Sequence, residues 1–302
     1  MGRLNHLLDI ESTPTDTLRS LLDTAQAVVD RPGDWRDRCR GRLQVNLFYE
    51  PSTRTRVSFE IAARRLGLDV VNVAAVGSSV AKGESLTDTY RTLEAMARDV
   101  IVLRHPENGV HHRLASDTCH LVNAGDGSRA HPSQALLDLL TMRQHRADLG
   151  SLKVLVAGDL HHSRVTMSGV ALMKKLGVGE IRLAAPPGLG APSQVSEGTR
   201  TYDELDAALD GVDVVMMLRV QRERLAGIDV PDSDAYHRAW GLDATRLGRA
   251  APGAIVMHPG PMNRGVEIAS EVADGPSSVI SRQVSNGVAT RMSILLHLLG
   301  EA

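Results

Sequence analysis

Short apolar segments of strand length alternate along this chain with longer segments of helical period. After an amphipathic helix over 15–29, the expected strands lie at 43–48, 70–73, 100–103, 121–123, 153–157, 180–184, 212–218 and 254–257. The expected helices between and after them cover 53–66, 85–97, 132–145, 163–176 and 203–209. Strands that alternate with helices in this way are typical of α/β proteins with parallel sheets. We therefore predict an α/β fold with two domains, each a parallel β-sheet flanked by helices.

The domain boundary is expected at the polar link 144–151, which separates two series of strands. The length of 302 residues suits two domains of ordinary size. We predict a first domain at 1–145 and a second at 146–283. The helical pattern of the C-terminal segment 284–302 is expected to pack back on the first domain.

Composition excludes several classes of partner. A formal net charge of −2 does not indicate a basic surface for nucleic acid or for an anionic membrane. An aromatic content of 3% does not indicate a set of rings on which bases stack. Residues 1–10 lack a signal-peptide pattern, and no apolar run approaches the length of a membrane span. The two cysteines, Cys39 and Cys119, cannot form a disulfide framework. We expect a cytoplasmic protein.

The segment 50–60 predicts an anion site. It follows the apolar strand 43–48, and Pro51 and Ser52 stand where a strand ends and a helix N-cap belongs. A helix N-terminus offers backbone N–H groups and the positive end of the helix dipole. Arg54 and Arg56 add forked donors that suit a phosphate or a carboxylate. The alternative is a capped surface helix with solvated arginines, and the number of cations and hydroxyls in the segment favours a phosphate site.

Three further polar loops follow strands of the first series. The loop 77–85 carries Ser78 and Lys82, and it is either a lid over an anion or a solvated surface loop. Arg104 ends an apolar strand, from which its side chain points either into the site or to water. His131 and Gln134 flank a helix start at Pro132, so both can face one ligand. The alternative to a ligand-facing His131 is a buried residue that caps the helix.

Loops of the second series add cations but no cofactor or metal motif. Gly158 lies in a strand-to-helix turn without the GxGxxG pattern, so we reject a dinucleotide site. Arg164 there, with Arg219 and Gln221 after a later strand, suits a small carboxylate. Histidines stand in adjacent pairs at 111–112 and 161–162. Neither pair has a carboxylate or cysteine at the spacing of metal ligands, so we expect no metal. A rigid Pro-Gly-Pro turn follows His258 and includes Gly260 and Pro261.

Taken together, these segments resemble the aspartate carbamoyltransferase family, catalytic chain, from Phe48 to the C-terminal helix. Carbamoyltransferases in general share Ser52-Thr-Arg-Thr55 and His131-Pro-x-Gln134. The aspartate-specific signals are Ser78…Lys82-Gly-Glu, Arg219-x-Gln221 and His258-Pro-Gly-Pro261. The His-Cys-Leu-Pro and Ser-Met-Gly segments usual in ornithine carbamoyltransferases are absent. Val165 and Tyr49 are mild departures from the family pattern.

The resemblance implies the first dedicated step of pyrimidine biosynthesis, in a crevice between the two domains. The α-amine of L-aspartate attacks the carbonyl carbon of carbamoyl phosphate, and phosphate leaves. The implied catalytic residues are Arg54, Thr55, Arg104, His131 and Gln134. The implied carbamoyl-phosphate site is Ser52, Thr53, Arg54, Thr55, Arg104, His131, Gln134, Gly260 and Pro261. The implied aspartate site is Lys82, Arg164, Arg219 and Gln221. No metal and no organic cofactor is implied.

The resemblance also implies a homotrimer in which Ser78 and Lys82 reach the active site of a neighbouring subunit. It leaves open whether regulatory or dihydroorotase chains join the trimer. Two other functions remain as alternatives: a carbamoyltransferase for another amino acid, and a catalytically idle homologue that serves as a scaffold. Idle homologues typically lose the anion-binding arginine or the histidine, and Arg54 and His131 are both present here.

Overall fold

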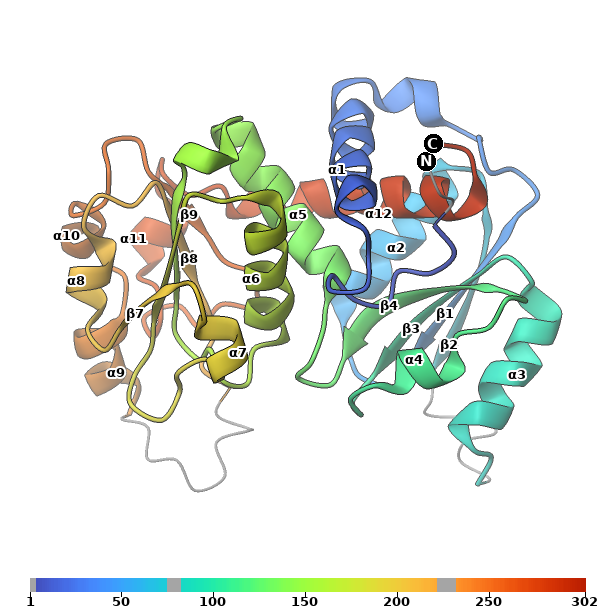
Figure 1. Ribbon diagram of the computed structural model, residues 1–302, viewed down its shortest axis with the longest axis horizontal. Helices are drawn as coiled ribbons and strands as arrows, with labels where there is room; N and C mark the ends of the chain where they lie inside the picture. The colour runs from blue at the N-terminus through green and yellow to red at the C-terminus, as the bar shows by residue number, and fades with distance from the viewer. Residues whose placement is uncertain (1–3, 75–82, 222–231) are drawn as a thin grey trace. The chain divides into compact units, whose positions relative to one another are not determined.

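Two parallel sheets organise the chain, and each belongs to its own unit. The computed structural model describes residues 4–74, 83–221 and 232–302. The first unit consists of Met1–Leu140 and Ser285–Ala302, and the second unit is Thr141–Val284. Figure 1 shows the elements of both units. The predicted α/β fold with two helix-flanked parallel sheets is confirmed.

The first unit is built around strands β1, β2, β3 and β4. Its elements are α1 Thr15–Asp30, η1 Pro32–Trp35, β1 Leu43–Phe48, α2 Thr53–Arg65, β2 Asp69–Ala74, α3 Leu86–Ala97, β3 Val100–His105, α4 Val110–Leu114 and β4 His120–Asp126. Helices α5 Pro132–His145 and α12 Ile280–Leu299 belong partly to this unit. The described strands pair in parallel in the order β2-β1-β3-β4.

Alternate residues of the central strands pack on opposite faces of this sheet. Val45 and Leu47 of β1 share a core with Ile101 and Leu103 of β3 and with α3 residues such as Tyr90. On the other face, the Gln44 side-chain amide donates to the Phe59 carbonyl of α2 at 3.4 Å. Burial on both faces explains why these strands are apolar over most of their length.

Helix α12 returns to the first unit and contacts α1. The Ser293 hydroxyl donates to the Leu21 carbonyl at 2.7 Å. The Ser20 hydroxyl lies 3.0 Å from His297 Nε2. These contacts join segments that are more than 270 positions apart in the sequence.

The second unit has strands β5 to β9, which pair in parallel in the order β7-β6-β5-β8-β9 among the described residues. Its elements are η3 Leu149–Ser151, β5 Lys153–Ala157, α6 Arg164–Leu176, β6 Glu180–Ala184, α7 Ser193–Ser196, β7 Arg200–Tyr202, α8 Leu205–Leu209, β8 Val214–Met217, α9 Ser233–Trp240, α10 Ala244–Leu247, β9 Ile255–Met257 and α11 Ser270–Ala273. Its core brings Leu155 and Val215 together with Tyr236 and Trp240 of α9.

Several elements differ from the expected ones. Strand β7 was not predicted from the sequence, because it is short and lacks an apolar run. The helices α4, α7, α9, α10 and α11 were not predicted either. Strand β4 extends to Asp126, because its polar C-terminal residues are buried in the sheet. Strand β8 covers only part of the expected range 212–218.

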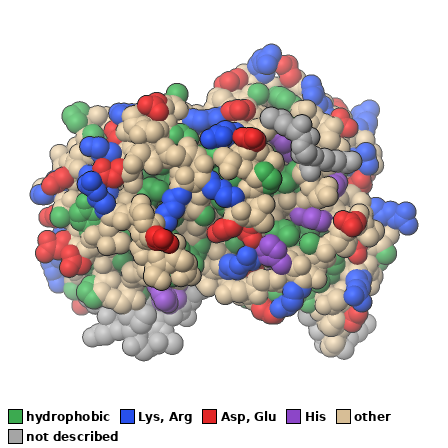
Figure 2. All heavy atoms as spheres, in the orientation of Figure 1, with side chains coloured by type: hydrophobic (Ala, Val, Ile, Leu, Met, Phe, Trp, Pro, Cys, Tyr) green, Lys and Arg blue, Asp and Glu red, His purple; other side chains and the backbone are tan. Residues whose placement is uncertain are grey.

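The surface agrees with the near-neutral formal charge. On the face shown in Figure 2, basic and acidic side chains are intermixed and do not gather into a field of one sign. Within the described ranges, no helix combines the length and the hydrophobicity needed to cross a membrane.

Both cysteines are free and buried, and we expect them to be unreactive in the folded protein. Burial raises the pKa of Cys39 to about 11 and that of Cys119 to about 12. A raised pKa lowers the thiolate fraction at neutral pH about tenfold per unit, and the thiolate is the reactive form. Titration with a chromogenic disulfide should detect almost no thiol in the native protein and two thiols per chain in denaturant. Rapid reaction in the native state would contradict the burial of these side chains.

Candidate active site

The N-terminus of α2 is held where β1 ends. Ser52 is its N-cap residue, as predicted, and its carbonyl accepts from the Arg56 N–H at 3.1 Å. In the described structure the Ser52 side chain makes no capping hydrogen bond to the helix. The first turn therefore presents its backbone N–H groups without a capping hydroxyl from the chain itself. Thr55 is buried in this turn, whereas Thr53 and Arg54 are exposed.

A chain of amide and carboxylate contacts fixes α2 on the sheet. The Asn46 side chain donates to Asn72 Oδ1 at 2.9 Å, which joins β1 to β2. The Asn72 side chain in turn donates to Glu60 Oε2 on α2 at 3.1 Å. Asn46 is buried, whereas Asn72 is exposed and Glu60 is partly exposed, so these directional contacts run from the sheet interior to the surface of α2.

Arg104 ends β3 beside the end of β1. Phe48 is its register partner, so the β1–α2 turn and Arg104 lie at the same edge of the sheet. Arg104 Nε lies 3.2 Å from Glu50 Oε2, and Arg104 Nη1 donates to the Ala124 carbonyl at 3.3 Å. The side chain is buried, so it does not point to water, which was one of the two alternatives left open by the sequence. Glu50 therefore holds the Arg104 guanidinium in place at this edge.

His131 and Gln134 lie at the start of α5, which follows β4. The His131 carbonyl accepts from the N–H groups of Gln134 at 3.0 Å and Ala135 at 3.2 Å. The backbone of His131 thus caps the helix, and its imidazole is buried. The Gln134 side-chain amide donates to Asp138 Oδ1 at 2.9 Å. Strands β1, β3 and β4 therefore each lead at their carboxyl ends to a predicted site residue, as is usual for α/β sites.

A buried arginine near the start of α5 was not predicted from the sequence. Arg291 of α12 lies 4.9 Å from the centre of the Phe59 ring and donates to the Gly287 carbonyl at 2.9 Å. Its Nη2 lies 3.5 Å from the Ser133 hydroxyl. Burial lowers the pKa of Arg291 to about 10, although the charge of Asp138 acts in the opposite direction. The available sequence signal was one arginine inside an apolar helical segment.

In the second unit, Asp159 ties two site loops together. Its carboxylate lies 2.9 Å from His162 Nδ1 and accepts from the Gln221 N–H at 3.3 Å. The Gln221 side-chain amide donates to the His162 carbonyl at 3.0 Å. These contacts join the β5–α6 turn to the segment after β8. The two segments lie close together because β5 and β8 are parallel neighbours. Asp159 is fully buried, and the sequence analysis gave it no role.

The same turns place the two predicted carboxylate-binding arginines. Arg164 is the first residue of α6, and the Ser163 hydroxyl caps that helix by accepting from the Thr166 N–H at 3.2 Å. Arg219 lies two residues after β8, next to the buried Val220. Both arginines thus follow the carboxyl ends of adjacent strands. Ser78 and Lys82 lie outside the described residues.

The turn that contains Gly260 and Pro261 follows β9. Gly260 has a φ of 67°, a left-handed conformation that favours glycine. The Gly260 N–H donates to His258 Nδ1 at 2.9 Å. His258 Nε2 lies 3.1 Å from Glu267 Oε1, and both side chains are fully buried.

The adjacent histidines diverge toward different partners. His111 Nε2 lies 2.9 Å from the Leu103 carbonyl, whereas His112 Nε2 lies 2.7 Å from Asp9 Oδ2. His162 contacts Asp159, and its ring meets that of His161 edge to face. Among the residues that the structure describes, no group of three His, Cys, Asp or Glu side chains could hold a metal ion.

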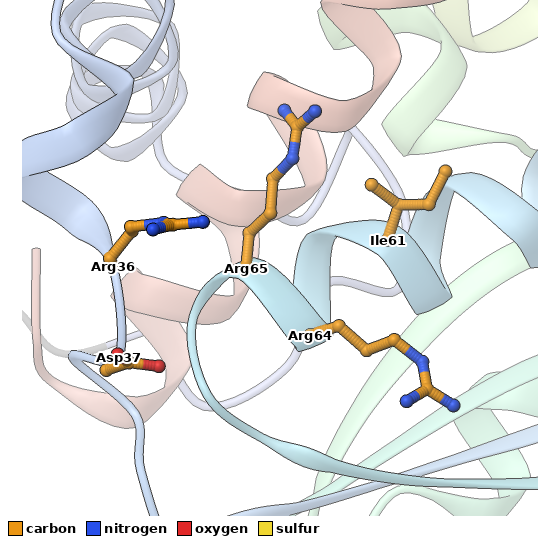
Figure 3. Close-up of a pocket in the computed structure, with 5 residues that line it drawn as sticks. All are labelled: Arg36, Asp37, Ile61, Arg64 and Arg65. Carbon is orange, nitrogen blue, oxygen red and sulfur yellow. The ribbon is translucent and has the colours of Figure 1, made fainter.

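A hollow of about 400 Å³ in the first unit lies apart from the predicted site residues. It is lined by Arg36, Asp37, Ile61, Arg64 and Arg65, as Figure 3 shows. Arg64 pairs with Glu60 at 3.0 Å, and it points away from Arg36. Arg64 and Arg65 belong to the last turn of α2, where cations offset the helix dipole. We assign no ligand to this hollow.

Known proteins resemble this chain over nearly its whole length. Residues 5–144 match the family model described as the carbamoyl-P binding domain of aspartate/ornithine carbamoyltransferase. Residues 151–298 match the Asp/Orn binding domain of the same family. A curated relative, the aspartate carbamoyltransferase catalytic subunit of Stenotrophomonas maltophilia, is 49% identical over 99% of this chain and 97% of its own length.

Two solved structures show the same fold. Aspartate transcarbamoylase from Trypanosoma cruzi, in complex with carbamoyl aspartate and phosphate, aligns with a TM-score of 0.86 at 30% identity, covering 98% of this chain and 95% of that one. Ornithine carbamoyltransferase from Thermus thermophilus aligns with a TM-score of 0.86 at 25% identity, covering 99% and 100%. Both family models, the curated relative and these folds agree, so the chain belongs to the aspartate/ornithine carbamoyltransferase family.

Proposed function

We propose that this protein transfers the carbamoyl group of carbamoyl phosphate to the α-amine of L-aspartate, giving N-carbamoyl-L-aspartate and phosphate. The observation that carries the proposal is that the described motif residues follow the carboxyl ends of the strands, in a chain 49% identical to an aspartate carbamoyltransferase catalytic subunit. The solved relative with carbamoyl aspartate and phosphate supports the same chemistry.

The first domain, 1–145, would bind carbamoyl phosphate. The phosphate would lie at the N-terminus of α2, where Ser52, Thr53, Arg54 and Thr55 supply backbone and side-chain donors. Arg54 would also offset the negative charge that grows on the bridging oxygen as the phosphate leaves. A family-model match described as a carbamoyl-P binding domain supports this assignment.

The carbonyl oxygen of the substrate becomes negative as the amine attacks. Thr55, Arg104 and His131 would donate to it, and one such donor is typically worth about 3–4 kcal/mol. Glu50 holds the Arg104 guanidinium at the sheet edge before the substrate binds. Gln134 and the Gly260 carbonyl would orient the carbamoyl nitrogen, with Pro261 beside them. Much of the acceleration would come from positioning two bound reactants.

The second domain, 146–283, would bind aspartate. Arg164 and Arg219 would hold the two carboxylates, and Gln221 supports them through its contacts with the β5–α6 turn. The family-model match to an Asp/Orn binding domain supports an amino-acid site here. An aspartate side chain requires cations, whereas ornithine would require anionic or polar groups for its extra ammonium.

A homotrimer would complete each site with Ser78 and Lys82 from a neighbour. An exposed apolar surface supports a subunit contact near this loop: Val57 is 41% exposed and Ile61 37% exposed on α2, and Val71 is 46% exposed on β2. Within the described sheet, β2 is an edge strand and directly precedes the loop that carries Ser78 and Lys82. We place the enzyme in the cytoplasm and in pyrimidine biosynthesis, and we assign no regulatory or dihydroorotase chain to it.

Product formation tests the proposal. Carbamoyl phosphate is incubated with L-aspartate and, in parallel, with L-ornithine and other amines. We expect kcat/KM for aspartate to exceed that for ornithine at least about a hundredfold, because the guanidinium groups of the aspartate site would repel the extra ammonium of ornithine. The related fold of an ornithine enzyme makes this comparison necessary. Activity only with another amine would overturn the assignment of aspartate as the acceptor. The absence of turnover in a folded protein would favour the scaffold alternative.

A further inference from the structure

One buried carboxylate holds both ends of the turn after β9. Glu267 Oε1 accepts from the Asn263 N–H at 2.6 Å, which fixes the end of the turn directly. The same oxygen lies 3.1 Å from His258 Nε2, and His258 Nδ1 accepts from the Gly260 N–H. The segment between Gly260 and Asn263 is therefore held at its start through His258 and at its end by Glu267 itself.

The hydrogen bonds define the protonation of His258. Nδ1 accepts from a backbone N–H, so it carries a lone pair and no proton. Nε2 therefore carries the proton and donates to the carboxylate of Glu267. The imidazole is neutral, and each of its two nitrogens has a distinct task.

This arrangement is costly for stability. Glu267 is completely buried, and within the described residues its Oε2 has no hydrogen-bond partner. A buried carboxylate oxygen without a partner loses its hydrogen bonds to water and gains none from the protein. A buried polar atom without a partner is rare in native proteins, and a functional role is one of its recognised explanations.

We propose that His258 is a positioning residue for carbamoyl phosphate, acting through the backbone of Gly260, and that Glu267 orients the His258 imidazole. This inference rests on the proposed function, in which the Gly260–Pro261 segment contacts that substrate. The hydrogen bond to His258 fixes the peptide plane before Gly260 and so limits the directions that the Gly260 carbonyl can take. Neither side chain needs to touch the substrate.

Two substitutions of His258 separate its two nitrogens. His258→Gln keeps an N–H near the Nε2 position for Glu267 but removes the acceptor for Gly260. His258→Asn keeps an oxygen near the Nδ1 position for Gly260 but removes the donor to Glu267. His297→Gln is the matched control, because each nitrogen of His297 also has one partner: Nδ1 lies 2.9 Å from the Ser293 carbonyl and Nε2 lies 3.0 Å from the Ser20 hydroxyl, both in the first unit.

Steady-state kinetics should separate the variants. We expect His258→Gln to raise KM for carbamoyl phosphate about tenfold at saturating aspartate, with KM for aspartate within about twofold of the unmodified protein. His258→Asn should stay within about threefold in KM for carbamoyl phosphate while lowering the denaturation midpoint. His297→Gln should leave both KM values unchanged. An unchanged KM in His258→Gln, or an equal rise in both His258 variants, would overturn the positioning role.

Amide hydrogen exchange tests the hydrogen bond from Gly260 to His258 without catalytic turnover. The Gly260 amide should be protected in the unmodified protein, and its exchange should be at least about tenfold faster in His258→Gln. Fast exchange in the unmodified protein overturns the inference even if His258→Gln fails to fold. Failure of the unmodified protein to carbamoylate any amine would instead overturn the proposed function, since the exchange measurement does not depend on it.

Discussion

Replacement of Arg54 by alanine is expected to lower kcat roughly a thousandfold while the protein stays folded. Arg54 lies in the first turn of α2, where the leaving phosphate would bind. Loss of its guanidinium removes a charge-assisted donor that is needed most as the bridging oxygen becomes negative. Because that charge is largest in the transition state, kcat should fall more than KM for carbamoyl phosphate rises.

The stability of this variant should change little. Arg54 is exposed, and alanine is a strong helix former, so we expect the free energy of unfolding to change by less than about 1 kcal/mol. Arg65→Ala is a matched control, since Arg65 is an exposed arginine in the last turn of the same helix. It should retain the original kcat. Equal rates in Arg54→Ala and Arg65→Ala would contradict phosphate binding at the start of α2.

The strand–turn–helix segment around residues 43–66 was predictable because its signals are local. An apolar run, a proline, a cap residue and a helical period are adjacent in the sequence, and the structure has β1 and α2 at these positions. The two parallel sheets were predictable for the same reason. Strand β7 was not, because a short edge strand can form from polar residues once its neighbour is in place.

The groups that hold the site residues could not be predicted from local patterns. Asp159 contacts Gln221, which is 62 positions away, and Arg291 reaches Ser133 across 158 positions. Such pairs exist only after the sheets bring distant segments together. His258 was recognised as part of a motif, yet its partner Glu267 and the division of tasks between its nitrogens follow from the folded turn alone.

Mixing two inactive variants should restore activity if neighbouring subunits share each site. Lys82→Ala is expected to lower kcat at least about a hundredfold, because an ammonium that binds substrate is lost. In a trimer assembled at random from equal amounts of Lys82→Ala and Arg54→Ala chains, a site is intact when its own chain keeps Arg54 and its neighbour keeps Lys82. That combination occurs at about one quarter of the sites. The mixture should therefore reach about one quarter of the original activity after denaturation and joint refolding.

A second mixture controls for refolding and exchange. Arg54 follows β1 and Arg104 lies near the end of the adjacent strand β3, in the same unit of one chain, so both would be supplied by the same subunit. Arg54→Ala refolded with Arg104→Ala should consequently regain no activity. The exposed Val57 of α2 and Val71 of β2 make a subunit contact on the first unit physically reasonable, because burying them would stabilise the assembly. If Lys82→Ala with Arg54→Ala regains no more activity than this control, each site uses the Lys82 of its own chain or none, and the shared-site trimer is wrong.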